Sequence, residues 1–280
     1  RLVSIENFGS MDVLCSDKTG TLTEGEVRLE GALDAQGSPS ERTLRLAAVN
    51  AAFQTGFNNP IDDAITAAAD HATFGAIRLD EIPYDFTRKR LSVLASMDGQ
   101  AVLVTKGALS QMIEACATVE LSDGRIVPMA GQQQAILERY AAFSARGLRT
   151  LGIAEKSLPG RCVAGREDET DLTFIGFLLF TDPPKAGIAA TVLELRGLGI
   201  TLKVITGDNQ LVAREIAKQI GLVDARIVSG QELRQVSDEA LPQRDDLLLH
   251  GFRFRSVEGT GCSLRAHPPA HCGRSAQNGG

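Results

Sequence analysis

The residues best able to do chemistry lie in one string near the start of the chain, Cys15-Ser16-Asp17-Lys18-Thr19-Gly20-Thr21-Leu22-Thr23. Asp17 follows a short apolar run, as expected at the carboxyl end of a buried parallel strand, where such sheets bind ligands. A carboxylate there can attack phosphorus and form an aspartyl phosphate. The loop after it offers backbone N–H groups, hydroxyls and a glycine to phosphoryl oxygens, and Lys18 adds positive charge. The other interpretation is a plain strand and turn in which Asp17 caps the backbone.

Three shorter strings follow along the chain: Lys106-Gly107-Ala108, Asp182-Pro183-Pro184-Lys185 and Thr206-Gly207-Asp208. Together with Asp17–Thr23 (DKTGTLT), these strings resemble the motifs of the P-type ATPases, in sequence and in order. DKTGTLT itself looks like the phosphorylation signature of that family. The segment Asn7–Leu14 looks most like the bacterial magnesium-translocating subclass. The resemblance extends from residue 1 to about residue 243.

The resemblance implies a role for each residue of a phosphorylation site. Asp17 would be the phosphorylated nucleophile, and it would hold the catalytic Mg²⁺ together with the backbone carbonyl of Thr19. Thr21 and Thr206 would donate hydrogen bonds to the transferred phosphoryl group. The predicted catalytic residues are Asp17, Lys18, Thr19, Thr21, Thr206 and Asp208.

The resemblance also implies an ATP site in an inserted domain. Phe86 would stack on adenine, since an aromatic face suits a base, and Lys106 and Asp62 would line the same pocket. Arg88 and Arg149 would face phosphates or ribose, because cations suit a triphosphate. The other interpretations are that Phe86 belongs to the core and that Arg88 lies in a solvated loop. The predicted ATP-binding residues are Asp62, Phe86, Arg88, Lys106, Gly107, Arg149, Asp182, Thr206, Gly207 and Asp208.

Thr19 helps to choose between related chemistries. Phosphatases of the haloacid-dehalogenase (HAD) superfamily carry a second acid two residues after the nucleophile, and this acid activates water against the phosphoenzyme. Threonine has no useful basicity at neutral pH, so an aspartyl phosphate on Asp17 would persist, as an ion pump requires. Two alternatives remain open from the residues alone: a stand-alone nucleotide-binding module and a HAD-type phosphohydrolase.

Composition limits the classes of partner. The 280 residues carry 35 acidic and 29 basic side chains, a net charge of −6, which disfavours a broad nucleic-acid surface. No apolar run approaches the roughly 20 residues of a spanning helix, and the five cysteines form no CxxC pair. We expect a soluble, cytoplasmic fragment whose parent protein lies in the plasma (inner) membrane. Its partner would be ATP, while the transported cation would bind only the full-length pump, whose membrane domain this chain lacks.

Hydrophobic periodicity indicates which elements position these residues. We expect an α/β fold in which a Rossmann-like, HAD-type parallel sheet domain, incomplete here, carries an inserted mixed α/β nucleotide-binding domain. The strand at 172–180 is expected in the parallel sheet with the strands at 11–16 and 201–206. The other expected elements are helices at 40–53, 60–71, 109–118, 132–145, 184–196 and 209–220, a hairpin of strands 91–96 and 101–105, a strand at 150–154, and a loop at 159–170.

The expected domains are a first phosphorylation segment (1–27), the nucleotide-binding domain (28–170), a truncated second phosphorylation segment (171–244) and an unmatched tail (245–280). The tail holds three of the four histidines, two of the five cysteines and no lysine, with a spacing that fits no zinc site, and we expect a frameshift near Arg244 or disorder. The family's Gly-Asp-Gly loop and the lysine before it are missing: the chain has no such string and no lysine after Lys218. We therefore expect ATP binding with little or no phosphoenzyme.

Overall fold

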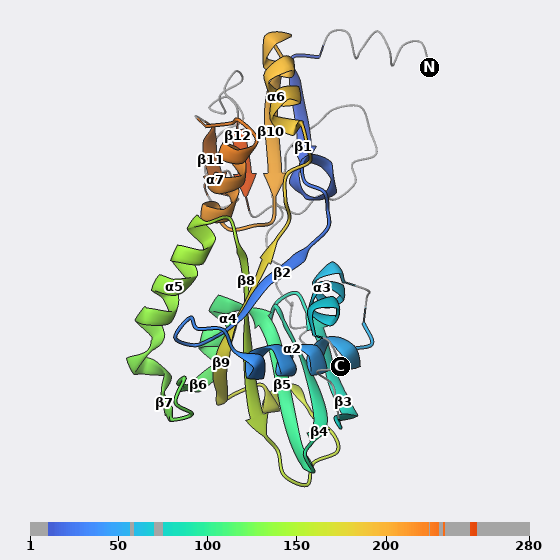
Figure 1. Ribbon diagram of the computed structural model, residues 1–280, viewed down its shortest axis with the longest axis vertical. Helices are drawn as coiled ribbons and strands as arrows, with labels where there is room; N and C mark the ends of the chain where they lie inside the picture. Colours follow the sequence, from blue (N-terminus) through green and yellow to red (C-terminus); the bar gives the residue numbers. More distant parts are fainter. Residues whose placement is uncertain are drawn as a thin grey trace, which may run out of the picture.

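The computed structural model describes residues 11–56, 59–69, 75–223, 225–229, 232 and, for the backbone, 247–250. These residues form two β-sheets with helices packed on them (Figure 1). Among them, no helix is both long and apolar enough to cross a membrane.

The smaller sheet is parallel and includes the first strand of the chain. Its order is β1-β10-β12-β11, and Asp17 at the end of β1 pairs with Ile205 of β10. Helices α6 and α7 pack on it around a core that includes Val192, Val204 and Val212. The pairing predicted between the first strand and the strand ending at Thr206 is confirmed. Its elements are β1 (Val13–Asp17), α6 (Ile188–Gly197), β10 (Thr201–Thr206), α7 (Gln210–Gln219), β11 (Arg226–Ser229) and β12 (Leu247–His250).

The strand β12 lies beyond residue 244, where the unmatched tail was expected to begin. Its backbone pairs with β10 on one side and β11 on the other. Four residues of the segment expected as an unmatched, frame-shifted or disordered tail therefore form a strand of the smaller sheet. The run Leu247-Leu248-Leu249 is a short apolar segment of the kind that parallel strands use, and the unusual composition of the whole tail concealed it. Residues 251–280 lie outside the described residues.

The larger sheet has eight strands and is mostly antiparallel, in the order β3-β4-β5-β8-β9-β6-β7, with β2 also paired to β9. Helices α2 and α3 pack on one face and α4 and α5 on the other. Its elements are β2 (Arg28–Asp34), α2 (Glu41–Phe53), α3 (Pro60–Ala68), β3 (Ile77–Asp85), β4 (Arg90–Met97), β5 (Gln100–Ala108), α4 (Leu109–Ala115), β6 (Cys116–Glu120), β7 (Ile126–Pro128), α5 (Gln133–Ala145), β8 (Arg149–Ser157) and β9 (Leu172–Thr181).

The strand β9 is not in the parallel sheet, contrary to the sequence prediction. It pairs antiparallel with β8 and β2, and parallel only with β6. Its side chains are buried on both faces, with Phe174 in one core and Ile175 in the other. A strand buried on both sides is apolar throughout in either kind of sheet, so its periodicity does not identify its neighbours. In Figure 1, β2 and β9 run between the two sheets.

Most other elements agree with the sequence. The helices at 41–53, 60–68, 133–145 and 210–219 and the hairpin of β4 and β5 are confirmed. Ser40, Asn59 and Asn209 cap three of these helices with their side chains, as is usual for these residue types. The helix expected at 109–118 instead ends at Ala115, because the next residues pair with β9 as strand β6.

Candidate functional site

Three of the four motif strings, those that contain Asp17, Asp182 and Asp208, meet at the end of β1. Lys18 Nζ donates to Asp208 Oδ2 at 2.6 Å, although the two residues are 190 positions apart. The same ammonium lies 3.6 Å from Asp182 Oδ2. The lysine side chain is 7% exposed and the two aspartate side chains are each 11% exposed, so this is a largely buried cluster of one cation and two anions.

The Asp182–Lys185 segment clamps the loop that follows Asp17. Asp182 Oδ2 accepts from Thr23 Oγ1 at 2.7 Å, and Asp182 Oδ1 accepts from the Gly25 N–H at 3.0 Å. Lys185 adds two bonds, from its N–H to the Leu22 carbonyl and from Nζ to the Gly20 carbonyl. Thr23, fully buried here, was not among the predicted site residues, although it lies in the same string. Residues distant in sequence, Asp182 and Lys185, therefore fix the conformation of the loop.

The clamp leaves the reactive groups accessible. The side chains of Asp17, Thr19 and Thr21 are exposed at the loop surface. Thr206, by contrast, is buried, and its Oγ1 accepts from the Asp208 N–H at 3.1 Å. Thr206 thus shapes the Thr206-Gly207-Asp208 turn that presents Asp208 to the lysine.

The donors predicted for Mg²⁺ are the Asp17 carboxylate and the Thr19 carbonyl. Both are hard oxygen donors, and proteins often hold Mg²⁺ by one or two carboxylates together with waters and substrate phosphates. The two groups fit that pattern. Across the part of the chain that the structure describes, no group of three or more His, Cys, Asp or Glu side chains could hold a metal alone.

A cleft lies between the two sheets beside this cluster. It is lined by Lys18, Asp182 and Asp208 and also by Arg149, the first residue of β8 in the larger sheet. Arg149 was predicted to face phosphates or ribose, and the structure puts it on the cleft shared with the loop after Asp17 rather than beside Lys106. Along β8, Lys106 pairs instead with Ile153.

Lys106 and Asp62, which were predicted to line one pocket, form a buried ion pair. Lys106 Nζ on β5 contacts Asp62 Oδ1 on α3, with the two side chains 3% and 8% exposed. Burial lowers the pKa of Lys106, while the neighbouring carboxylate opposes that shift. Gly107 is required next to it because a Cβ there would lie 2.6 Å from the Arg90 Cβ. The glycine lets the β4 backbone approach β5 closely at this point.

Phe86 lies on the loop between β3 and β4, and it is 64% exposed, so the alternative that it belongs to the core is wrong. Its ring meets Tyr84 edge to face, with centroids 5.2 Å apart. Asp85 shapes the loop, since its Oδ1 accepts from the N–H groups of Thr87 and Arg88 at 2.7 and 2.9 Å. The backbone hydrogen bonds from Arg88 and Thr87 lower the pKa of Asp85. An ordered loop therefore carries the largely exposed side chain of Phe86.

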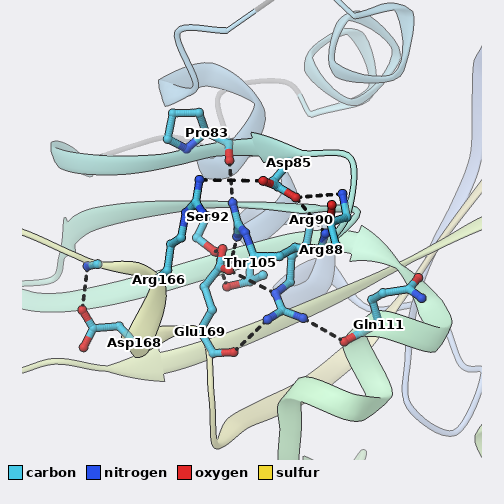
Figure 2. Close-up of polar contacts among 12 residues, drawn as sticks. Pro83, Asp85, Arg88, Arg90, Ser92, Thr105, Gln111, Arg166, Asp168 and Glu169 are labelled. Carbon is cyan, nitrogen blue, oxygen red and sulfur yellow. Dashed lines mark hydrogen bonds and ion pairs between the residues drawn. The ribbon is translucent and has the colours of Figure 1, made fainter. Parts of the chain in front are cut away.

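Arg88 points inward from this loop (Figure 2). Its Nη1 contacts the buried carboxylate of Glu169, and its Nη2 donates to the Pro83 carbonyl at 2.9 Å. The solvated-loop alternative is therefore wrong for Arg88, whose side chain is 16% exposed. Its predicted contact with phosphate or ribose stays a prediction. Sequence reasoning missed Glu169, which lies in a polar stretch that gave no sign of burial.

A hydrogen-bonded bridge joins the two parts of the molecule next to Asp208. Asn209 Nδ2 donates to Tyr140 Oη at 2.9 Å and to Ser144 Oγ at 3.0 Å, both on α5. Asn209 Oδ1 accepts from the Leu211 and Val212 N–H groups and so caps α7. Sequence reasoning missed this bridge, because helix capping alone explains an asparagine at that position.

Comparison with known proteins identifies the family of this chain. Residues 4–187 match the family described as P-type ATPase, cytoplasmic domain N. The chain is 38% identical over 250 residues to "Magnesium-transporting ATPase, P-type 1" of Salmonella typhimurium strain LT2 and of Escherichia coli strain K12. It is 29% identical over 266 residues to "Calcium-transporting ATPase 1" of Lactococcus lactis. Each match covers 86% of this chain but only 27–30% of the relative's length. The chain belongs to the P-type ATPase family.

Proposed function

We propose that this chain is the cytosolic catalytic part of an ATP-driven cation transporter, with Asp17 as the residue that ATP phosphorylates. The observation that carries the proposal is the meeting of Lys18 with Asp182 and Asp208 beside the accessible Asp17. Three separate strings of the family's pattern converge there. The magnesium-transporting relatives favour Mg²⁺ as the transported ion.

The nucleotide would lie between the two sheets. Phe86 offers its exposed face to the base, and Lys106 with Asp62 forms the polar wall of the base pocket. Arg149, on the cleft, is positioned to meet phosphates near Lys18. The smaller parallel sheet, with its nucleophile at a strand end, supports a HAD-type, Rossmann-like assignment for that part.

The chemical step is an in-line attack of an Asp17 carboxylate oxygen on the γ-phosphorus of ATP. The new O–P bond replaces the bond to the β,γ-bridging oxygen, and ADP leaves with that electron pair. Thr21 would hydrogen-bond the transferred group, and Lys18, fixed by two aspartates, keeps positive charge next to the loop. Bound Mg²⁺, held by Asp17 and Thr19, would supply charge neutralisation. Since Thr19 is a poor base, water attack on the product is slow.

We expect this 280-residue polypeptide to bind ATP and to form little phosphoenzyme. It holds no Gly-Asp-Gly string and no lysine after Lys218, groups that the family resemblance assigns to Mg²⁺ binding and charge neutralisation. Loss of a single such group slows a reaction by roughly 10²–10³-fold. Calorimetric titration with ATP and acid-stable labelling from γ-labelled ATP measure the two properties separately.

The outcomes separate the alternatives. No ATP binding at millimolar concentration contradicts the proposed function. Robust label on Asp17, abolished by Asp17→Asn, contradicts the expected impairment but supports the assignment of the nucleophile. Steady release of phosphate from p-nitrophenyl phosphate, lost in the same variant, would favour the phosphohydrolase instead.

A further inference from the structure

Glu169 is the most deeply buried acid in the network of Figure 2, with a side chain 0% exposed. It precedes β9 and lies 81 positions from Arg88 in sequence. Its Oε2 accepts from Arg88 Nη1 and from Arg90 Nε, the latter at 3.1 Å. Its Oε1 accepts from Ser92 Oγ at 2.7 Å, and Ser92 in turn contacts Thr105. One carboxylate therefore holds two guanidinium groups away from solvent.

The two arginines depend on Glu169 to different degrees. Arg90 has two further anchors, since its Nη1 donates to the Gln111 carbonyl at 3.2 Å and its Nη2 to the Glu169 carbonyl at 3.4 Å. Arg88 has only the Pro83 carbonyl besides the carboxylate, and its buried Nε has no hydrogen-bond partner among the described residues. Breaking a buried ion pair leaves an uncompensated buried charge. Without the carboxylate, Arg88 is thus the group that would leave its position.

Arg88 belongs to the loop that carries Phe86, and its backbone N–H binds Asp85 Oδ1 at 2.9 Å. The far end of the loop is already fixed, because the Ala108 N–H donates to the Lys89 carbonyl at 3.0 Å. Asp85, at the end of β3, holds the N–H groups of Thr87 and Arg88, and the Arg88 side chain adds a second tie, from the middle of the loop to the buried Glu169. Movement of Arg88 would move Phe86 relative to Lys106.

We propose that Glu169 is a positioning residue for the nucleotide: through Arg88, it holds the Asp85–Lys89 loop so that Phe86 faces the base. The inference rests on the proposed function, because it assigns Phe86 to adenine. It makes Arg88 a support of the loop, with its guanidinium directed into the protein.

The chain has no tryptophan, so Phe86→Trp introduces a single fluorescent reporter into the loop. In that background, Glu169→Gln keeps the shape of the side chain and removes its charge. Glu167→Gln, at an exposed acid two residues earlier, is the matched control. Acrylamide quenching without nucleotide reports the loop position, and titration with ATP and with AMP reports affinity.

We expect greater quenching in Glu169→Gln than in the control. Affinity should fall about tenfold for both nucleotides, because a loop that no longer holds Phe86 in place weakens its stacking on the base. Arg88→Gln should have the same effects, and the double variant should lose no more than either single variant. Additive losses, or a loss confined to ATP, contradict the proposal, because they indicate a general structural role or a phosphate contact.

Two further outcomes are decisive. If Glu169→Gln does not fold, Arg88→Gln alone carries the test, since Glu169 keeps Arg90 as partner, and unchanged quenching in that variant overturns the proposal. If the Phe86→Trp chain with Glu169 intact binds no ATP, the proposed function fails. The quenching comparison, made without nucleotide, still decides whether Glu169 holds the loop.

Discussion

The Lys106 side chain is buried, and burial disfavours its charged form. Its side chain is 3% exposed, and desolvation lowers its pKa despite the contact with Asp62. Between the lowered folded-state value and the ordinary value of 10.5, the unfolded chain binds more protons than the folded one. The free energy of unfolding therefore rises with pH in that window. Nucleotide affinity should show the opposite trend, because the proposed function assigns the charged form of Lys106 to nucleotide binding.

As pH rises, affinity for ATP should accordingly decline, and the midpoint of that decline should lie below pH 10.5. In Asp62→Asn the decline should move to still lower pH, because the variant removes the carboxylate that opposes the shift. Calorimetric titrations across alkaline pH measure this, with Asp63→Asn, at an exposed neighbour, as the control. A decline at the same pH in both variants would contradict a role for the Lys106–Asp62 pair in binding.

At the scale of elements, the Asn209 side chain forms hydrogen bonds from the start of α7 to α5. Asn209 caps α7 and also donates to Tyr140 and Ser144 of α5, whereas Asn59 at the start of α3 caps its helix by accepting from the Ile61 N–H. Both asparagines cap a helix, but only Asn209 also forms hydrogen bonds to a second helix. This pair allows the bridge to be measured separately from the cap.

We expect Asn209→Ala to destabilise the chain more than Asn59→Ala does. Loss of the cap costs about 0.5–2 kcal/mol at either position. Loss of the bridge adds roughly 1–3 kcal/mol at Asn209, because Ser144 is fully buried and loses its partner. Urea denaturation followed by circular dichroism gives both values. Equal losses would mean that the bridge contributes nothing to stability.

Sequence patterns predicted the elements with local signals correctly but not the pairing between distant strands. The helices that begin at capping residues and the hairpin at Asp98-Gly99 have local signals, and both are confirmed. The neighbours of β9 depend on contacts with distant strands, which a uniformly apolar run does not encode. The motif strings indicated that Lys18, Asp182 and Asp208 would meet, but Glu169 has no comparable signal. Its importance comes from burial, and burial is a property of the folded chain.

At the scale of the whole molecule, the smaller sheet relies on a late segment. The strand β12 lies between β10 and β11, so β11 has no direct pairing with β10 among the described strands. Residues 247–250 therefore connect the edge of this sheet to the strand that ends at Thr206. Composition alone would have assigned them to a tail without a structural role.

Two truncations test this dependence. A chain that ends after residue 246 should lose cooperativity in the smaller sheet and melt at a lower temperature than one that ends after residue 250. The reason is that each lost strand pairing exposes backbone groups that must then bind water. Differential scanning calorimetry compares the two chains. Identical thermograms would show that β12 contributes no stability.

The register of β8 also sets a length scale for the ligand. Ile153 lies beside Lys106, and Arg149, four residues earlier on the same strand, lines the cleft with Lys18. At 3.3 Å per residue, that separation is about 13 Å. Under the proposed function, this separation along β8 is what the nucleotide has to span between Lys106 and the loop after Asp17. A nucleoside triphosphate, with a longer phosphate chain than a monophosphate, suits that separation.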